Sequence, residues 1–225
     1  MTRNRDNKAV IFDLDGVLVN TGPFHRQSWF DLAGKEGLKM SDELFSRTFG
    51  MQNYQILPLL AGCDLSADQI KRMSDWKEKR YRELIAERLT LAEGAETLIN
   101  ELQTNGFLLA IGSSAPRENI DFICRRIPLL GSLNAYVAGE DVSRGKPAPD
   151  TFLKAAKELS IAPNRCVVVE DAVQGIQAAK AAAMHAVALT TTRSREELLE
   201  ADLIVDSLAE LKADDFFALL TQVFP

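Results

Sequence analysis

Two aspartates separated by a single residue follow a short apolar run near the start of the chain. The run "AVIF" covers residues 9–12, and Asp13 and Asp15 come after it in "AVIFDLDGVLVNTG". Because alternate side chains of an extended strand point to the same side, the two carboxylates are expected to project into one small volume. Two such charges repel each other unless a proton or a cation lies between them. The spacing therefore indicates a metal ion or proton-transfer chemistry.

Polar residues also follow other apolar runs. Ser113 and Ser114 follow "FLLAIG", Glu170 and Asp171 follow "CVVV", and Lys146 lies between a glycine and a proline in "RGKPAPD". Four carboxylates on neighbouring loops suit a hard divalent cation such as Mg²⁺, which takes oxygen ligands. The lysine and a serine suit the oxygens of a bound anion, most simply a phosphate.

Each of these residues alone has a structural explanation. A serine after a strand is common in turns, and a single lysine is usually a solvated surface charge. A functional site is favoured because all the clusters come at the ends of strand-like runs or in the loops between them. Ligands of a doubly wound sheet bind outside the carboxyl ends of its strands.

The runs that must position these residues alternate with amphipathic segments. Strand-like runs are expected at residues 9–12, 107–111, 135–138, 166–169, 186–189 and 203–205. Continuous apolar strands separated by helices are typical of a parallel sheet covered on both faces. A helix is expected over residues 149–161, with Pro149 at its first position, and "SREE" from residue 194 predicts a capping box before another helix.

The interval from about residue 20 to residue 88 breaks this alternation, because it holds only helical patterns. The last of them opens with a capping box from Ser66 to Gln69. The interval is too long for an ordinary strand-to-helix connection. We therefore expect an α/β fold: a Rossmann-like three-layer core with a parallel sheet (residues 1–19 and 89–225) and an inserted helical domain (residues 20–88).

Bulk composition limits the possible partners and compartments. The 26 lysines and arginines against 32 acidic residues give a net charge of −6, which disfavours binding to nucleic acid. No run approaches the roughly 20 apolar residues of a membrane span, and the polar first residues predict no secretory leader. Three widely spaced cysteines without a CxxC pattern predict neither a disulfide framework nor a zinc cluster, and favour a cytoplasmic location.

Four segments, taken in order, resemble the four motifs of the haloacid dehalogenase superfamily: "FDLDGVL", "AIGSSAP", "GKPAPD" and "EDAVQGIQAA". The helical insert after the first motif is similar to the cap domain of subfamily IA, in the β-phosphoglucomutase-like phosphatase branch. The likeness covers the chain from Lys8 onward. It implies an Mg²⁺-dependent phosphoryl-transfer enzyme that acts on a small phosphorylated metabolite.

The resemblance also implies roles for the core residues. Asp13 would be the nucleophile that forms an aspartyl-phosphate, and Asp15 the general acid and then the general base. That second role requires surroundings that keep a proton on Asp15 when it is needed. Mg²⁺ would be held by Asp13, by the main-chain carbonyl of Asp15 and by Asp171, with Glu170 joining directly or through water.

Further residues would bind the substrate. Ser113 and Lys146 would hold the oxygens of the transferred group, where charge spreads in the transition state. The remaining substrate-binding residues that the resemblance implies are Ser114, Arg117, His25, Lys77, Gln52 and Asn53. Of these, Gln52 and Asn53 lie where the mutases carry an arginine that holds a distal phosphate, which weakens the likeness to a mutase.

Three functions remain in view. We expect a phosphatase of a sugar or polyol phosphate, acting as a monomer or weak homodimer. The alternative enzyme is a β-phosphoglucomutase-type sugar phosphomutase. The alternative that is not an enzyme is a phosphoaspartate receiver module for signalling, which the insert and Asp15 disfavour, because such a module needs a persistent phosphoaspartate.

Overall fold

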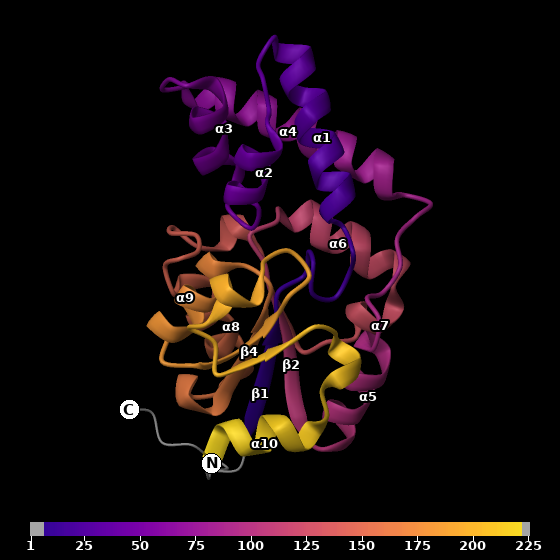
Figure 1. The fold of residues 1–225 in the computed structure, drawn as a ribbon. Coiled ribbons are helices and arrows are strands. Elements are labelled where there is room, and N and C mark those ends of the chain that lie inside the picture. Colours follow the sequence, from indigo (N-terminus) through magenta and orange to yellow (C-terminus); the bar gives the residue numbers. More distant parts are fainter. Residues whose placement is uncertain (1–6, 222–225) are drawn as a thin grey trace.

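A computed structural model describes residues 7–221 and shows a sheet with helices on both sides (Figure 1). Six parallel strands form this sheet in the order β3-β2-β1-β4-β5-β6. They are β1 (Lys8–Phe12), β2 (Phe107–Gly112), β3 (Ala135–Val137), β4 (Cys166–Glu170), β5 (His185–Leu189) and β6 (Leu203–Val205). Each predicted run forms a strand, and the α/β fold is confirmed. Residues 1–6 and 222–225, the two ends of the predicted core, lie outside the described part.

Alternate residues of the strands face two different apolar clusters. In β1, Val10 and Phe12 pack into one cluster, and Ala9 and Ile11 into the other. The first face is covered by α5 (Ala95–Thr104), α6 (Arg117–Arg126) and α10 (Ala213–Thr221), and the second by α8 (Asp150–Leu159) and α9 (Val173–Ala181). Burial of both faces explains why the strands are continuously apolar.

Short helices complete the core. They are α7 (Pro128–Gly131), η1 (Gly139–Asp141), η2 (Pro163–Arg165), η3 (Arg195–Leu198) and η4 (Leu208–Glu210). The predicted capping box from Ser194 forms, but it opens only the single 3₁₀ turn of η3. Strand β6 begins at Leu203, so the segment between the capping box and the strand is short. Pro149 lies at the N-cap of α8 and not at its first helical position.

Four helices between β1 and α5 form a separate helical insert, which Figure 1 shows grouped at one end of the sheet. They are α1 (Gly22–Glu36), α2 (Asp42–Thr48), α3 (Asn53–Ala61) and α4 (Ala67–Ile85). Trp29, Leu57 and Met73 belong to an apolar cluster formed by insert residues alone. The predicted capping box is present, since Ser66 Oγ accepts from the Gln69 amide at 3.3 Å and Gln69 Oε1 from the Ser66 amide at 2.9 Å. The boundaries at residues 20 and 88 stay a prediction.

Length and polarity of the helices bear on membrane insertion. Within residues 7–221, no helix combines the length and the apolar character that a bilayer crossing requires.

Leu198, the last residue of η3, and Leu199, which follows it, allow a matched test of the packing. Leu198 is 1% exposed and packs with the second face of the sheet, whereas Leu199 is 72% exposed. We expect Leu198→Ala to lower the free energy of unfolding by about 2–5 kcal/mol, because it leaves a cavity. Leu199→Ala should change it by less than about 0.5 kcal/mol. Urea denaturation measures both, and equal losses would contradict this packing.

Candidate active site

The carboxyl ends of β1, β2 and β4 bring the predicted motif residues to one edge of the sheet. The Asp13 amide donates to the Val169 carbonyl at 2.9 Å, which extends the pairing of β1 with β4. The Ser113 amide donates to the Val137 carbonyl at 3.0 Å, at the end of β2. Glu170 is the last residue of β4. Parallel register therefore places side chains from distant parts of the sequence next to each other.

Lys146 lies between two of these carboxylates and is 2% exposed. Its Nζ is 2.5 Å from Asp13 Oδ1 and 2.5 Å from Glu170 Oε1. Burial alone would lower the pKa of Lys146, but the two carboxylates raise it above its usual value. The other oxygen of Glu170 accepts from the amides of Asp171 at 2.9 Å and Ala172 at 3.0 Å. The two main-chain amides thus hold the Glu170 carboxylate in place, and this carboxylate in turn positions the Lys146 ammonium group.

Three buried carboxylates gather at this point and form a candidate metal site. Asp13, Glu170 and Asp171 each offer a ligand oxygen, and these atoms lie within 4.8 Å of one another. Burial raises the pKa of Asp13 to about 7, with Glu170 adding to the rise and Lys146 opposing it. Burial and the charges of Glu170 and Asp13 raise the pKa of Asp171 well above its usual value. One lysine does not balance three carboxylates, and an all-oxygen donor set fits Mg²⁺.

Thr192 bonds to Asp171, and Gly16 leaves the space that its carboxylate occupies. Thr192 Oγ1 lies 2.7 Å from Asp171 Oδ2 and 2.8 Å from the Asp171 carbonyl oxygen, and its one proton can be donated to either. Gly16 has a φ of +88°, and a Cβ there would lie 2.2 Å from Asp171 Oδ2. Thr192 was not among the predicted site residues, although the hydroxyl residues directly after the predicted run at 186–189 were a signal for it.

Asp15 is surrounded by hydrogen-bond donors on one of its oxygens. Oδ1 accepts from Thr21 Oγ1 at 2.5 Å and from the Tyr81 hydroxyl at 3.2 Å, and it lies 3.1 Å from His25 Nε2. Although burial opposes ionisation, His25, Thr21 and Lys77 lower the pKa of Asp15 to about 2. The surroundings seen here therefore favour the carboxylate, whereas the acid role was expected to need a proton.

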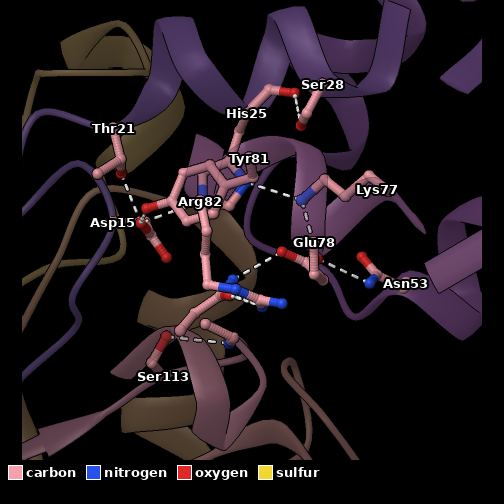
Figure 2. Close-up of polar contacts among 12 residues, drawn as sticks. Asp15, Thr21, His25, Ser28, Asn53, Lys77, Glu78, Tyr81, Arg82 and Ser113 are labelled. Atoms are coloured by element: carbon pink, nitrogen blue, oxygen red, sulfur yellow. Dashed lines mark hydrogen bonds and ion pairs between the residues drawn. The ribbon is translucent and has the colours of Figure 1, made fainter. Parts of the chain in front are cut away.

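The helical insert adds a second polar group, which Figure 2 shows beside Asp15. His25 stacks on Tyr81 with ring centroids 3.9 Å apart. Lys77 Nζ lies 2.8 Å from His25 Nδ1 and donates to Glu78 Oε1 at 2.9 Å. Residues from α1 and α4 thus form a continuous chain of contacts that ends on the Asp15 carboxylate.

Glu78, which was not among the predicted site residues, is the other end of this series of contacts. Its Oε1 also accepts from Asn53 Nδ2 at 2.8 Å, and its Oε2 accepts from Asn119 Nδ2 at 2.6 Å. Arg82 NH1 in turn donates to Asn119 Oδ1 at 2.7 Å. Because Asn119 belongs to α6 of the core, Glu78 joins the insert to the core. No short motif marks this contact in the sequence.

A cavity of about 50 Å³ lies between the insert and the sheet edge. The core contributes Asp13, Asp15, Ser113 and Ser114, and the insert contributes His25, Asn53, Lys77 and Glu78. Ser114 Oγ is buried there without a hydrogen-bond partner. A cavity of this size holds only a few water molecules. The insert therefore lies against the core edge and leaves little free space there.

Two predicted substrate-binding residues do not line this cavity. Gln52 packs between Gly139 and Gly145, and its Nε2 donates to the Gly139 carbonyl at 2.7 Å. Arg117 pairs with Asp141 and donates to the carbonyl of Tyr136 at 3.1 Å. The other predicted residues lie at the site or line its cavity. Gln52 and Arg117 instead make contacts with residues outside the cavity.

Comparison with known proteins identifies the family. The family model described as "haloacid dehalogenase-like hydrolase" matches residues 7–183. The chain belongs to the haloacid dehalogenase-like hydrolases. It is an enzyme, a phosphoric monoester hydrolase of this family, close to the β-phosphoglucomutase and CbbY-like proteins of subfamily IA. The resemblance predicted from the four motifs is confirmed.

Three relatives illustrate the likeness. The chloroplastic 5-amino-6-(5-phospho-D-ribitylamino)uracil phosphatase of Arabidopsis thaliana is 33% identical over 209 residues, which are 92% of this chain and 56% of that protein. The β-phosphoglucomutase of Bacillus subtilis (strain 168) is 31% identical over 212 residues, 91% of each chain. The crystal structure of a β-phosphoglucomutase from Clostridium difficile has a TM-score of 0.86 at 27% identity and covers 95% of this chain and 97% of its own.

The candidate metal site leads to a test by thermal unfolding. We expect Mg²⁺ to stabilise the protein by about 2.7 kcal/mol at a hundred times its Kd, because it balances the buried carboxylates. Asp171→Asn should remove most of this effect and, without Mg²⁺, should not destabilise, because it relieves repulsion. Asp121→Asn, an exposed change on α6, is the control and should keep it. An equal Mg²⁺ shift in Asp171→Asn, at constant ionic strength, would contradict the assignment.

Proposed function

We propose that this hydrolase removes the phosphoryl group from a small phosphorylated sugar or polyol through an aspartyl-phosphate on Asp13, with Mg²⁺ as its cofactor. The observation that carries the proposal is the position of Asp13. Its carboxylate lines the closed cavity together with Asp15 and Ser113, while Lys146 contacts Oδ1 from the buried side. The substrate in the name of the Arabidopsis relative carries a phosphorylated ribityl group, which supports a polyol phosphate.

In the first half of the reaction, the Asp13 carboxylate attacks phosphorus in line with the leaving oxygen. The bond from Asp13 to phosphorus forms as the bond to the leaving oxygen breaks, and Asp15 gives that oxygen its proton. Negative charge on the phosphoryl group beside Asp15 favours its protonated form, against the lowered pKa seen in this arrangement. Ser113 and Lys146 hold the phosphoryl oxygens.

In the second half, water attacks the phosphorus of the aspartyl-phosphate. Asp15 takes a proton from that water. It is ionised and so able to accept the proton, because its pKa is lowered to about 2. The bond between Asp13 and phosphorus breaks, inorganic phosphate leaves and Asp13 is restored. Closure of the insert keeps other water out of the cavity meanwhile.

Mg²⁺ would be held by Asp13, Asp171 and the main-chain carbonyl of Asp15. When bound, it neutralises charge on the phosphoryl group and so reduces the repulsion of that group by the attacking carboxylate. Both oxygens of Glu170 are already engaged, one by Lys146 and the other by two amides. This supports contact of Glu170 with the metal through water.

The mutase alternative differs in using a sugar hydroxyl as the acceptor of the phosphoryl group. Such an enzyme must hold a sugar bisphosphate by its second phosphate. Gln52 and Arg117 lie outside the cavity, and Asn53 donates to Glu78. These contacts favour hydrolysis. The receiver alternative is disfavoured by the family match and by the insert.

We also propose a cytoplasmic location for this protein. All three cysteines are free, which fits the reducing conditions of a cytoplasm. We expect a monomer or weak homodimer, with neither nucleic acid nor a membrane as a partner. The acidic net charge of −6 supports the first of these exclusions.

Replacing the nucleophile tests the mechanism. We expect Asp13→Asn to lower kcat by about 10³-fold or more, because an amide does not attack phosphorus. Thermal unfolding should show that the variant folds, and Asp121→Asn should keep the wild-type rate. Phosphate release from the variant at more than a tenth of the wild-type rate would refute the aspartyl-phosphate.

A substrate panel separates the two enzymes. Phosphorylated sugars, polyols and nucleotides are incubated with Mg²⁺, and both free phosphate and isomerised sugar phosphate are measured. We expect free phosphate from a narrow group of sugar or polyol phosphates, and chelation by EDTA should stop its release until Mg²⁺ is restored. An isomer formed from β-glucose 1-phosphate, with a trace of bisphosphate and without free phosphate, would establish the mutase instead.

A further inference from the structure

The insert's side of the cavity carries a carboxylate that the mechanism above does not use. Glu78 is 5% exposed, lines the cavity and is drawn in Figure 2 between Lys77 and Asn53. The reacting phosphoryl group must lie against Asp13 and Ser113 on the core side. The rest of the substrate therefore extends towards the insert, where it meets Glu78.

The charges on this side of the cavity cancel. Among residues 7–221, Lys77 is the one lysine or arginine that lines the cavity. Its ammonium group is 2.9 Å from Glu78 Oε1 and 2.8 Å from His25 Nδ1, so its charge is already matched. A second phosphate or a carboxylate on the substrate would find no unpaired cation here. It would also lie near the Glu78 carboxylate, which already neutralises the Lys77 cation.

Glu78 is held in place and kept ionised. Asn53 from the insert and Asn119 from the core both donate to its carboxylate. Burial alone would raise the pKa of Glu78, but the charges of Lys77 and His25 and the hydrogen bonds from Lys77 and Asn53 lower it. Glu78 is therefore a fixed carboxylate that neutralises the Lys77 ammonium group. Its oxygens can accept a hydrogen bond from a hydroxyl or an amine.

We propose that Glu78 makes the enzyme reject substrates that carry a second anionic group, and so restricts it to monophosphates whose other end bears hydroxyl or amino groups. This inference rests on the proposed phosphatase function and narrows its substrate class. Discrimination by charge is effective in a closed cavity, because an unmatched buried charge is strongly unfavourable.

A purely structural role for Glu78 gives different expectations. In that case the carboxylate would matter only because it ties α4 to α3 and α6 through Asn53 and Asn119. Glu78→Gln keeps the shape of the side chain and loses the charge, whereas Glu78→Asp keeps the charge and shortens the side chain. The two variants therefore separate charge from fit. Glu83→Gln removes an exposed charge from the same helix and serves as the matched control.

The experiment compares kcat/KM for paired substrates with Mg²⁺: fructose 6-phosphate with fructose 1,6-bisphosphate, and glucose 6-phosphate with glucose 1,6-bisphosphate. p-Nitrophenyl phosphate reports on the chemistry alone. We expect the wild type to prefer each monophosphate by about tenfold or more, and Glu78→Gln to reduce this preference by about tenfold. Glu78→Asp and Glu83→Gln should keep it.

Each other outcome overturns the inference. If the wild type does not prefer the monophosphates over the bisphosphates, the inference is wrong, even if Glu78→Gln fails to fold. It is also overturned by a preference that survives in Glu78→Gln, or by one that Glu78→Gln and Glu78→Asp lose equally, as a structural role requires. In these cases hydrolysis persists and the proposed function stands. If no phosphate ester is hydrolysed, p-nitrophenyl phosphate included, the proposed function fails and the inference fails with it.

Discussion

A buried ammonium group between two buried carboxylates is the interaction on which the site depends. Lys146 contacts Asp13 and Glu170, and removing one partner from such a group leaves an uncompensated charge. Glu170 is held by the amides that follow it, and Gly175 makes room, because a Cβ there would lie 1.9 Å from the Glu170 carboxyl carbon. The sheet edge, the loop that carries Lys146 and the start of α9 therefore have to be positioned together.

The helical insert meets the core through polar contacts. Its buried apolar cluster contains no core residue, and the two core clusters contain none from α1–α4. Contacts between the two parts include Gln52 to the Gly139 carbonyl, Asn119 to Glu78, Gln174 to the Arg47 carbonyl and Arg193 to the Ser46 carbonyl. Such bonds exchange with water at little net cost. This suits an insert that opens to admit a substrate and closes over it.

What the sequence predicted follows from local signals. Apolar runs gave all six strands, and the residues placed after them gave Asp13, Ser113, Glu170 and Asp171. The contacts of Glu78 were not predictable in this way, because its partner Asn119 is distant in sequence and belongs to a helix of the core. Arg117 directly follows the motif "AIGSSAP" in the sequence, and for that reason it was predicted to bind the substrate. The direction of its side chain is set by contacts with Asp141 and Tyr136, which no local sequence pattern encodes.

The insert occupies the connection between neighbouring strands β1 and β2. Loop-closure entropy grows only with the logarithm of length, so lengthening a connection from a dozen to roughly 90 residues costs about 2 kcal/mol. The insert has its own apolar cluster, and the burial of this cluster offsets part of that entropic cost. The polypeptide can thus exchange one insert for another of different size at this point while the strand ends, and the chemistry they hold, stay the same.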